Sequence, residues 1–420
     1  MFPGSRRSFP TALNRFGWAA SLIVGCLVGG SPVAGATGDW PAWRGPSATG
    51  GVDGDAAYPE RWSVDSVAWK TELPGKGTST PVVAGGRIYL TSPSAGQDAF
   101  LAYDLQGHKL WETPLGALSD PRHRSLAYFA AVDLGGRVLW KHQLTERFGP
   151  EKLYWDSGAS PLIAGDSIVI SRLHDGESWV AAFDRRNGEL RWKIARKSAA
   201  PAENNNGYAT PLLVDQSGRP AVLVWGADHV TTHALDDGRV LWTAGGFNPS
   251  GTANWPAIAT PVRAGDTVLL PVGRDDRPGQ ANLYGLRLGG SGDVSSSHKV
   301  WERHDLGVFV TAPALFDGRA YLLRHRGEVA CVDPATGKTH WTAAFPKASA
   351  PYYASPLVAG GVLYAAREDG VVFAARVGRE FRLLSENPMG ERIIASPVPA
   401  AGRLILRGDQ HLFCIAGPSR

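Results

Sequence analysis

The residues best suited to chemistry in this chain are polar and aromatic side chains that cluster just before a recurring proline. Aromatic rings supply a stacking surface and amides supply directed hydrogen bonds, a combination that suits sugars, peptides or cofactor rings. We therefore predict a ligand-binding site formed by Lys76, Tyr154, Trp155, Asp156, Asn204, Asn205, Tyr208, Asn254, Trp255, Tyr352, Tyr353 and Arg392. The alternative is that these side chains fill a narrow channel and hydrogen-bond to one another.

No catalytic or metal-binding motif accompanies these residues. The sequence has no H-E-x-x-H, P-loop or G-x-S-x-G pattern, and its 11 histidines are scattered. His229 and His233 lie in a predicted strand, where residues four positions apart are separated by about 13 Å and are not stacked on one another. We expect no catalytic residue and no metal site, so the sequence favours binding over an enzymatic activity.

The recurring proline follows a small or hydroxyl residue and opens an apolar, strand-like run each time. The seven copies are Thr80-Pro81, Ser160-Pro161, Thr210-Pro211, Thr260-Pro261, Ala312-Pro313, Ser355-Pro356 and Ser396-Pro397. Successive prolines are 80, 50, 50, 52, 43 and 41 residues apart. Self-similarity at about 40–50 residues is typical of bladed or stacked repeats.

Each repeat consists of four short runs that we interpret as strands. The first two form a hairpin with a Gly turn, as in residues 82–90, and the third ends on Asp, as at Asp184. A Gly turn then leads to a fourth run that carries Trp, as from Gly188 to Trp192. Asp could bind calcium, but Asp also caps turns, Gly supplies their positive φ, and both recur in nearly every repeat. We predict that Asp and Gly shape the turns and that the Trp rings pack between neighbouring sheets.

Four-stranded sheets repeated at this length indicate an all-β propeller. Between Trp111 and Ser160, residues 126–140 supply only the second half of a repeat. An eight-bladed ring with a degenerate second blade is therefore favoured, and seven blades is the alternative. The last repeat, residues 396–415, has no Trp strand, whereas residues 67–70 form a Trp strand without a repeat. We expect these two segments to complete one blade and to close the ring.

The repeat as a whole resembles the pyrroloquinoline-quinone-like (PQQ-like) propeller repeat in its x-Pro, its Gly turns, its small-apolar-Asp run and its terminal Trp. That repeat is shared by quinoprotein alcohol dehydrogenases and by the propeller lipoprotein of the outer-membrane Bam assembly complex. Residues 39–46 and the path from Ala68 to Gly77 are similar to those of secreted bacterial PQQ-like proteins. The similarity covers residues 39–417 and is specific for the fold, while it leaves the activity open.

The resemblance raises the question of the cofactor pyrroloquinoline quinone. In quinoprotein dehydrogenases it lies between a Trp and a disulfide of adjacent cysteines, beside a calcium ion and a catalytic Asp. This chain has no adjacent cysteines, and no Asp or Glu matches that site by motif. We therefore do not expect PQQ, and the identity of any other cofactor stays open.

Taken together, these features indicate a non-catalytic propeller that binds a ligand or another protein. Its partner would be a protein, or a small molecule or glycan at the mouth of the central channel. The alternatives are a PQQ-dependent oxidoreductase and a scaffold for outer-membrane protein assembly.

The first 36 residues resemble a secretory signal peptide. Three arginines precede an apolar stretch over residues 16–30, and Ala34-Gly35-Ala36 offers a cleavage site. Residues 5–9 also fit the twin-arginine pattern. Cys26 ends a lipobox-like run, and its lipidation would attach the protein to a membrane. We favour cleavage after Ala36, which leaves a single propeller domain over residues 37–420 in the periplasm or outside the cell.

Charge argues against a nucleic acid as the partner. The chain has 43 basic and 39 acidic residues, and removing the three arginines of the leader leaves 40 against 39. A nucleic-acid-binding protein would be expected to keep a basic excess after processing.

Two stretches interrupt the repeats. Residues 274–277, Arg-Asp-Asp-Arg, are interpreted as a solvated hairpin tip, and residues 288–297 as a flexible loop insertion.

Overall fold

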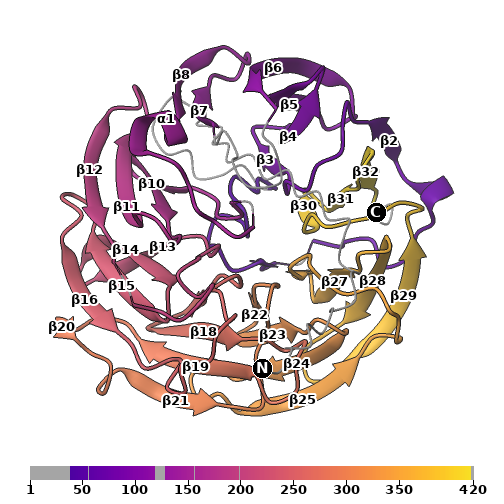
Figure 1. Ribbon diagram of the computed structural model, residues 1–420. Helices are drawn as coiled ribbons and strands as arrows, with labels where there is room; N and C mark the ends of the chain where they lie inside the picture. The colour runs from indigo at the N-terminus through magenta and orange to yellow at the C-terminus, as the bar shows by residue number, and fades with distance from the viewer. Residues whose placement is uncertain (1–37, 55, 119–127, 156, 198, 418–420) are drawn as a thin grey trace, which may run out of the picture.

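The computed structural model describes residues 38–417 except 55, 119–127, 156 and 198, and it shows β-sheets arranged in a ring (Figure 1). Each sheet runs from an innermost strand near the centre of the ring to an outermost strand at its perimeter. The predicted signal peptide, Cys26 and Asp156 lie outside the described residues. No helix in the described ranges is long and apolar enough to span a membrane.

Four blades take all of their strands from one stretch of the chain. They contain β3 (Val82–Ala84), β4 (Arg87–Ser94), β5 (Gln97–Asp104) and β6 (Lys109–Ala117); β9 (Leu162–Ala164), β10 (Ser167–Arg172), β11 (Trp179–Asp184) and β12 (Leu190–Ala195); β17 (Val262–Ala264), β18 (Thr267–Gly273), β19 (Ala281–Arg287) and β21 (Lys299–Arg303); and β22 (Ala314–Phe316), β23 (Arg319–Leu323), β24 (Glu328–Val332) and β25 (Thr339–Ala344). Neighbouring strands within each of these blades are antiparallel.

Three further blades include a strand from elsewhere in the chain. They contain β13 (Leu212–Gln216), β14 (Arg219–Gly226), β15 (His229–Ala234) and β16 (Val240–Ala244), with β20 (Gly292–Asp293); β26 (Leu357–Ala359), β27 (Val362–Ala366), β28 (Val371–Arg376) and β29 (Arg382–Pro388), with β1 (Gly51–Val52); and β30 (Val398–Ala400), β31 (Arg403–Arg407) and β32 (His411–Ile415), with β2 (Trp69–Glu72). The antiparallel pairing of β2 with β32 confirms the predicted closure of the ring by the two ends of the chain.

The segment predicted to be a truncated repeat forms a two-stranded sheet of β7 (Tyr128–Val132) and β8 (Val138–Gln143). One face of this sheet packs with Ile168 and Phe183 of the β9–β12 blade, and the other with Phe100 and Leu115 of the β3–β6 blade. The described residues thus form seven complete blades, the alternative count, with this half-sheet between two of them. The favoured count of eight is not confirmed, because no inner hairpin of the kind that opens every other blade accompanies β7 and β8 in the described ranges.

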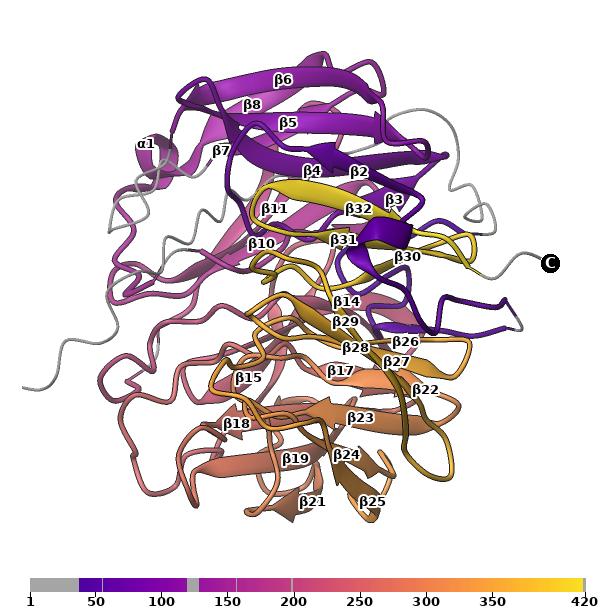
Figure 2. The ribbon, with the colours of Figure 1, turned by 90° about the vertical axis from the view of Figure 1, so that its right-hand side faces the viewer.

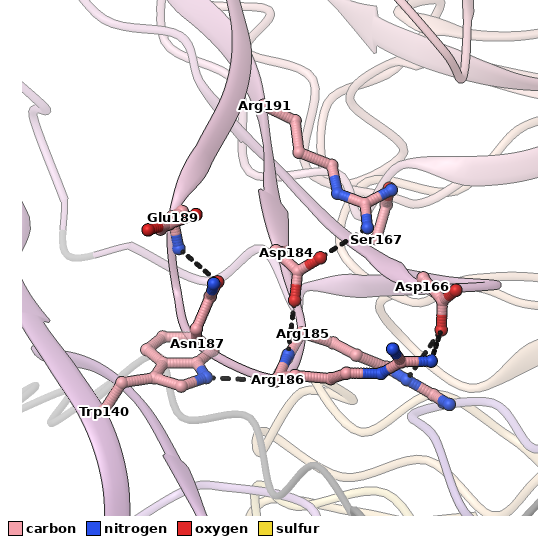
Figure 3. A network of polar contacts seen from close by, with 9 residues as sticks. All are labelled: Trp140, Asp166, Ser167, Asp184, Arg185, Arg186, Asn187, Glu189 and Arg191. Carbon is pink, nitrogen blue, oxygen red and sulfur yellow. Dashed lines mark hydrogen bonds and ion pairs between the residues drawn. The ribbon is translucent and has the colours of Figure 1, made fainter.

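The Trp residues of the outermost strands link neighbouring blades, as predicted. Figure 3 shows Trp140 of β8 donating its indole N–H to the carbonyl of Arg185, in the turn that follows Asp184 of the next blade, at 2.9 Å. Gly188 of that turn has φ +73°, and an added Cβ would lie 2.6 Å from the Trp140 ring. Six tryptophans donate such a bond to the next blade at 2.8–3.1 Å, and we call them the outer belt: Trp69, Trp111, Trp140, Trp192, Trp301 and Trp341. Asp, Gly and Trp therefore recur because the turn that Asp and Gly shape in one blade packs against the Trp ring of the preceding blade and accepts its hydrogen bond.

The residue before each recurring proline links neighbouring blades near the centre. The backbone N–H of Ser160 donates to Thr210 Oγ1 at 2.9 Å, and the N–H of Thr210 donates in turn to Thr260 Oγ1 at 2.9 Å. The same bond joins Ala312 to Ser355, Ser355 to Ser396 and Ser396 to Thr80, at 2.9–3.1 Å. We call the accepting hydroxyls Thr210, Thr260, Ser355, Ser396 and Thr80 the inner belt. A hydroxyl recurs before proline because it satisfies a backbone donor of the adjacent blade.

The remaining elements are short. The 3₁₀ helix η1 (Val64–Ser66) precedes β2, and α1 (Leu144–Phe148) follows β8. The predicted flexible insertion at residues 288–297 is instead pinned to its blade, because β20 pairs in parallel with β16 and Val294 N–H donates to the carbonyl of Thr243 at 2.8 Å.

Candidate functional site

A segment near the N-terminus crosses the centre of the ring. Trp40 pairs with Val83 of β3, and eleven residues later β1 pairs in parallel with β26 (Figure 1). Between them, the buried guanidinium of Arg44 donates to the carbonyls of Pro313 at 2.7 Å and Pro356 at 2.5 Å. Residues 40–52 therefore tie the innermost strands of three blades together across the channel.

This crossing turns the central channel into a cavity with a floor. The cavity has a volume of about 300 Å³, and its lining includes residues of the loops that lead into the innermost strands. In Figure 2 the face formed by these loops, with α1, is on the left. The lining consists of Pro41, Ala42 and Trp43 of the crossing segment, and of Thr78, Ser79, Thr80, Val82, Tyr89, Leu90, Thr91, Phe100, Ser157, Gly158, Ala159, Ser160, Pro161, Ile163, Tyr208, Ile258, Thr260, Val310, Tyr353, Ser355 and Ile394.

Within the part of the chain that the structure describes, the lining contains hydroxyl, aromatic and aliphatic side chains and no charged one. PQQ is a quinone with three carboxylates, and without a cation in the described lining a few hydroxyl donors do not offset the desolvation of that much charge. The residues of this cavity therefore do not fit PQQ. Among the described residues, no group of three or more His, Cys, Asp or Glu is placed to hold a metal ion.

Two predicted binding residues, Tyr208 and Tyr353, contribute to this cavity. The Tyr208 hydroxyl also accepts a hydrogen bond from the backbone N–H of Trp155 at 3.1 Å. The Tyr353 ring lies against His325, with 5.6 Å between ring centroids. Both rings are thus part of the wall and are fixed by their neighbours.

The predicted amides lie beside the cavity and hold loops together. Asn204 is fully buried; its Nδ2 donates to both carboxylate oxygens of Asp228 at 3.2 Å and to the carbonyl of Thr252 at 3.0 Å. Its Oδ1 accepts from the backbone N–H of Trp255 at 2.7 Å, and the backbone N–H of Asn254 donates to the carbonyl of Ala202. Asn204 therefore uses both the oxygen and the nitrogen of its side-chain amide to hold two neighbouring loops together.

Tyr154 and Trp155 lie on the rim of the channel mouth. Their side chains are 60% and 46% exposed, yet their rings pack edge to face with centroids 5.2 Å apart. The backbone beneath them is anchored, since Tyr154 N–H donates to Asn206 Oδ1 at 3.1 Å and Trp155 N–H to Tyr208. Asn206 belongs to the run of three asparagines in the mouth loops, of which the sequence analysis assigned Asn204 and Asn205 to ligand binding.

The other predicted residues have different surroundings. Tyr352 is 1% exposed and packs against Phe345 and Phe373, so it belongs to the core between blades. Arg392 forms ion pairs with Glu368 at 2.9 Å and Asp409 at 3.8 Å. Lys76 is exposed and Asn205 is half-buried in the loops of the mouth.

Asp275 was interpreted as part of a solvated hairpin tip, and this interpretation is wrong. Its side chain is 1% exposed and accepts from the backbone N–H of Phe309 at 2.8 Å and of His325 at 2.6 Å, while Arg324 Nε lies 3.7 Å away. Burial raises the pKa of Asp275 to about 6, although the two N–H donors and Arg324 oppose that shift. One carboxylate thus joins three loops at the mouth, and no local pattern distinguishes it from the neighbouring Asp276, which is half-buried and pairs with Arg274.

The comparisons with known proteins agree with this architecture. A family model described as outer membrane protein assembly factor BamB matches residues 62–128, 124–303 and 290–379, about three quarters of the chain. Comparison with the curated proteins finds no match.

Solved structures of the same fold include proteins with different roles. BamB from Moraxella catarrhalis is 16% identical, with a TM-score of 0.54 over 78% of this chain and 97% of its own. The quinohemoprotein alcohol dehydrogenase from Comamonas testosteroni is 12% identical, with a TM-score of 0.60 over 91% and 81%. Sqt1 from Saccharomyces cerevisiae is 10% identical, with a TM-score of 0.55 over 88% and 100%. At these identities the likeness concerns the fold alone.

Proposed function

The chain belongs to the family of the outer membrane protein assembly factor BamB, and on this premise we propose that it is a non-catalytic propeller that binds another protein outside the cytoplasm. The observation that carries the proposal is the exposed Tyr154–Trp155 pair on the rim of the channel mouth. Large aromatic residues contribute a disproportionate share of binding energy at protein interfaces.

The pair is arranged to limit the entropy lost on binding. Each of its two backbone N–H groups has a fixed acceptor in the neighbouring loop, Asn206 or Tyr208. The Trp155 side chain also hydrogen-bonds to Glu203, which opposes the rise that burial causes in the pKa of that carboxyl. A partner would therefore meet rings that are largely held in position before contact, which favours affinity.

The surroundings of the pair suit a protein partner better than a charged small molecule. Several charged groups of the rim are already paired, as Arg274 is with Asp276 at 2.7 Å and Arg392 with Glu368 at 2.9 Å. Such paired charges form a polar border around an aromatic contact, as is common at interfaces. A scaffold role is accordingly favoured over PQQ-dependent oxidation, whose cofactor the cavity does not fit.

Export is part of the proposal and rests on the leader-like residues 1–36. We expect the mature protein to begin after Ala36, and a lipidated Cys26 is the competing outcome. Mass spectrometry of the protein purified from its native envelope distinguishes the two, because a lipidated N-terminus adds a diacylglycerol mass. An unprocessed Met1 on cell-associated protein would contradict export.

A capture experiment with chemical cross-linking tests the interaction. The protein carrying both Tyr154→Ala and Trp155→Ala should lose the partners that the unchanged chain recovers from an envelope extract. The matched control carries Leu190→Ala and Val240→Ala, which truncate exposed hydrophobic side chains on two outermost strands away from the mouth. If the double aromatic variant recovers the same partners as this control, the rim is not the binding surface.

A further inference from the structure

The cavity below the rim has a chemistry of its own, distinct from that of the aromatic pair. Among the described residues its wall has no charged side chain, even though the surrounding loops contain Arg274, Asp276, Glu368 and Arg392. A charged group that entered the cavity would lose its hydration without meeting a counter-ion in the described lining itself, which is costly. Two buried guanidinium groups, those of Arg172 and Arg407, donate to Ser157 and Ser79 of the wall but do not line the cavity. The cavity therefore selects against ions.

Hydroxyl groups of the inner belt supply hydrogen-bond donors to this neutral space. Thr80, Thr260 and Ser355 line the cavity, and each accepts a backbone N–H from the neighbouring blade at 2.9–3.1 Å. Among the described residues none of these three O–H groups donates to a protein acceptor, so each remains available to a ligand. Acceptor oxygens are the ligand groups that such donors recognise.

The rest of the wall suits a flat apolar ring. Trp43 forms part of the floor, Tyr208 and Tyr353 lie in the wall, and Ile258 and Ile394 add aliphatic surface. Aromatic side chains favour stacked or edge-on contact with another ring. A volume of about 300 Å³ is at the small end of ligand pockets, so it admits one or two fused rings rather than an extended chain.

We propose that this cavity is a binding site for a small uncharged ring compound that carries hydrogen-bond acceptor oxygens. The ring is held against Trp43 and the two tyrosines, and its oxygens accept from the O–H groups of Thr80, Thr260 and Ser355. This site is independent of protein binding at Tyr154 and Trp155, which lie outside the wall.

Two probes with the same ring test the selection against charge. Coumarin is flat and neutral, with acceptor oxygens and no donor, whereas coumarin-3-carboxylate adds one negative charge. Isothermal titration calorimetry of the full chain at pH 7.5 should show one coumarin site per chain. The carboxylate should bind at least about tenfold more weakly. Equal affinities, or no binding of coumarin at millimolar concentration, would overturn the proposal.

Two substitutions of the inner belt separate binding from folding. Thr260→Val removes an O–H from the wall and also the acceptor of the Thr210 N–H bond. Thr210→Val removes the equivalent acceptor, that of the Ser160 N–H bond, but Thr210 is not part of the wall. We expect Thr260→Val to weaken coumarin binding by roughly three- to tenfold and Thr210→Val to leave it unchanged.

The melting temperatures of both variants show whether they fold, and they should fall by similar amounts. A loss of coumarin affinity that is equal in the two variants would mean that the belt acts only through stability, and it would contradict the assignment of Thr260 to the site. Because neither variant changes Tyr154 or Trp155, partner capture should be unaffected in both. The cavity proposal and the protein-interaction proposal can therefore fail separately.

Discussion

The outer belt and the channel mouth are built on opposite principles. Around the perimeter, six tryptophans make the same bond to the next blade, and the same Asp and Gly shape most of the turns that receive them. At the mouth, every blade contributes different residues: an aromatic pair in one loop, a buried Asn in the next, and a buried Asp further on. Residues that repeat hold the ring together, and residues that occur once are where binding can differ from other propellers.

The exceptions to each belt support this contrast. Trp242 lies where the next blade carries the insertion at 288–297, and it donates instead to Gln216 of its own blade at 3.0 Å. In the inner belt, Ala312 has no hydroxyl that could accept from the N–H of Thr260, in the way that Thr260 accepts from the N–H of Thr210. Where the local sequence departs from the repeat, the inter-blade bond is lost or redirected.

The largest effect is expected from breaking the outer belt. Trp140→Ala removes a ring that is 7% exposed, packs on Phe129 with 5.0 Å between centroids and lies against Gly188 of the next blade. We expect a loss of about 3–5 kcal/mol in the free energy of unfolding, measured with urea. Trp140→Phe keeps a ring and loses only the indole bond to Arg185, so it should cost less, with the lost bond contributing about 1 kcal/mol.

A change at the mouth supplies the contrast to that experiment. Tyr154→Ala with Trp155→Ala truncates exposed rings and should shift the same free energy by less than about 1 kcal/mol. If the mouth variant destabilises the protein as much as Trp140→Ala does, then the division between a structural perimeter and a functional mouth is wrong.

Asp275 gives the second-largest effect, as a function of pH. Its pKa is about 6 in the folded protein against an ordinary value of 3.8, so the folded state binds the proton more tightly than the unfolded state. Protonation of Asp275 thus stabilises the folded state, and this stabilisation is fully present below about pH 4. As the pH rises through 6 it is lost, which lowers the free energy of unfolding by on the order of 3 kcal/mol in total. Asp275→Asn should lack this part of the pH dependence between pH 4 and 7, as measured by urea unfolding. An unchanged slope in the variant would mean that Asp275 stays ionised over the whole range.

The repeat allowed most of the fold to be predicted from the sequence, because the features that mark it are local. Asp184, Gly188 and Trp192 lie within nine residues of one another, and their turn and strand form from that spacing. The pairing of β2 with β32 could also be predicted, since one repeat lacked the strand that the other end of the chain supplied. The number of complete blades could not, because half a repeat does not reveal whether its inner hairpin is present.

The site was less predictable because its residues act over long distances in the sequence. Arg44 reaches Pro356, 312 residues away, and nothing in residues 39–46 indicates that they cross a channel. Asn204 has the same chemistry whether it binds a ligand or joins two loops, and only packing decides between them. Sequence reasoning identified the loops of the mouth, whereas it could not identify which of their side chains face the cavity.

The third effect concerns a single bond of the inner belt. Thr210→Val keeps the shape of the side chain and removes the acceptor of the Ser160 N–H bond at 2.9 Å. The expected loss is about 1 kcal/mol, the usual contribution of one hydrogen bond. The same substitution tests the cavity proposal as its control, so unfolding and coumarin titration can be measured on one preparation. A variant as stable as the unchanged chain would show that the belt has no energetic role.

The smallest effect should be a gain, from restoring the belt where it is interrupted. Ala312 precedes Pro313 in the position that Thr or Ser occupies in the other repeats, and its own N–H already donates to Ser355 Oγ at 2.9 Å. Ala312→Ser would offer an acceptor to the N–H of Thr260, and a serine is small enough to follow the same backbone. We expect a stabilisation of about 0.5–1 kcal/mol, visible as a higher urea midpoint with an unchanged slope. Because Ala312 is 2% exposed, a lower midpoint would indicate that the added oxygen is crowded rather than bonded, and the belt would then depend on blade spacing as well as on residue type.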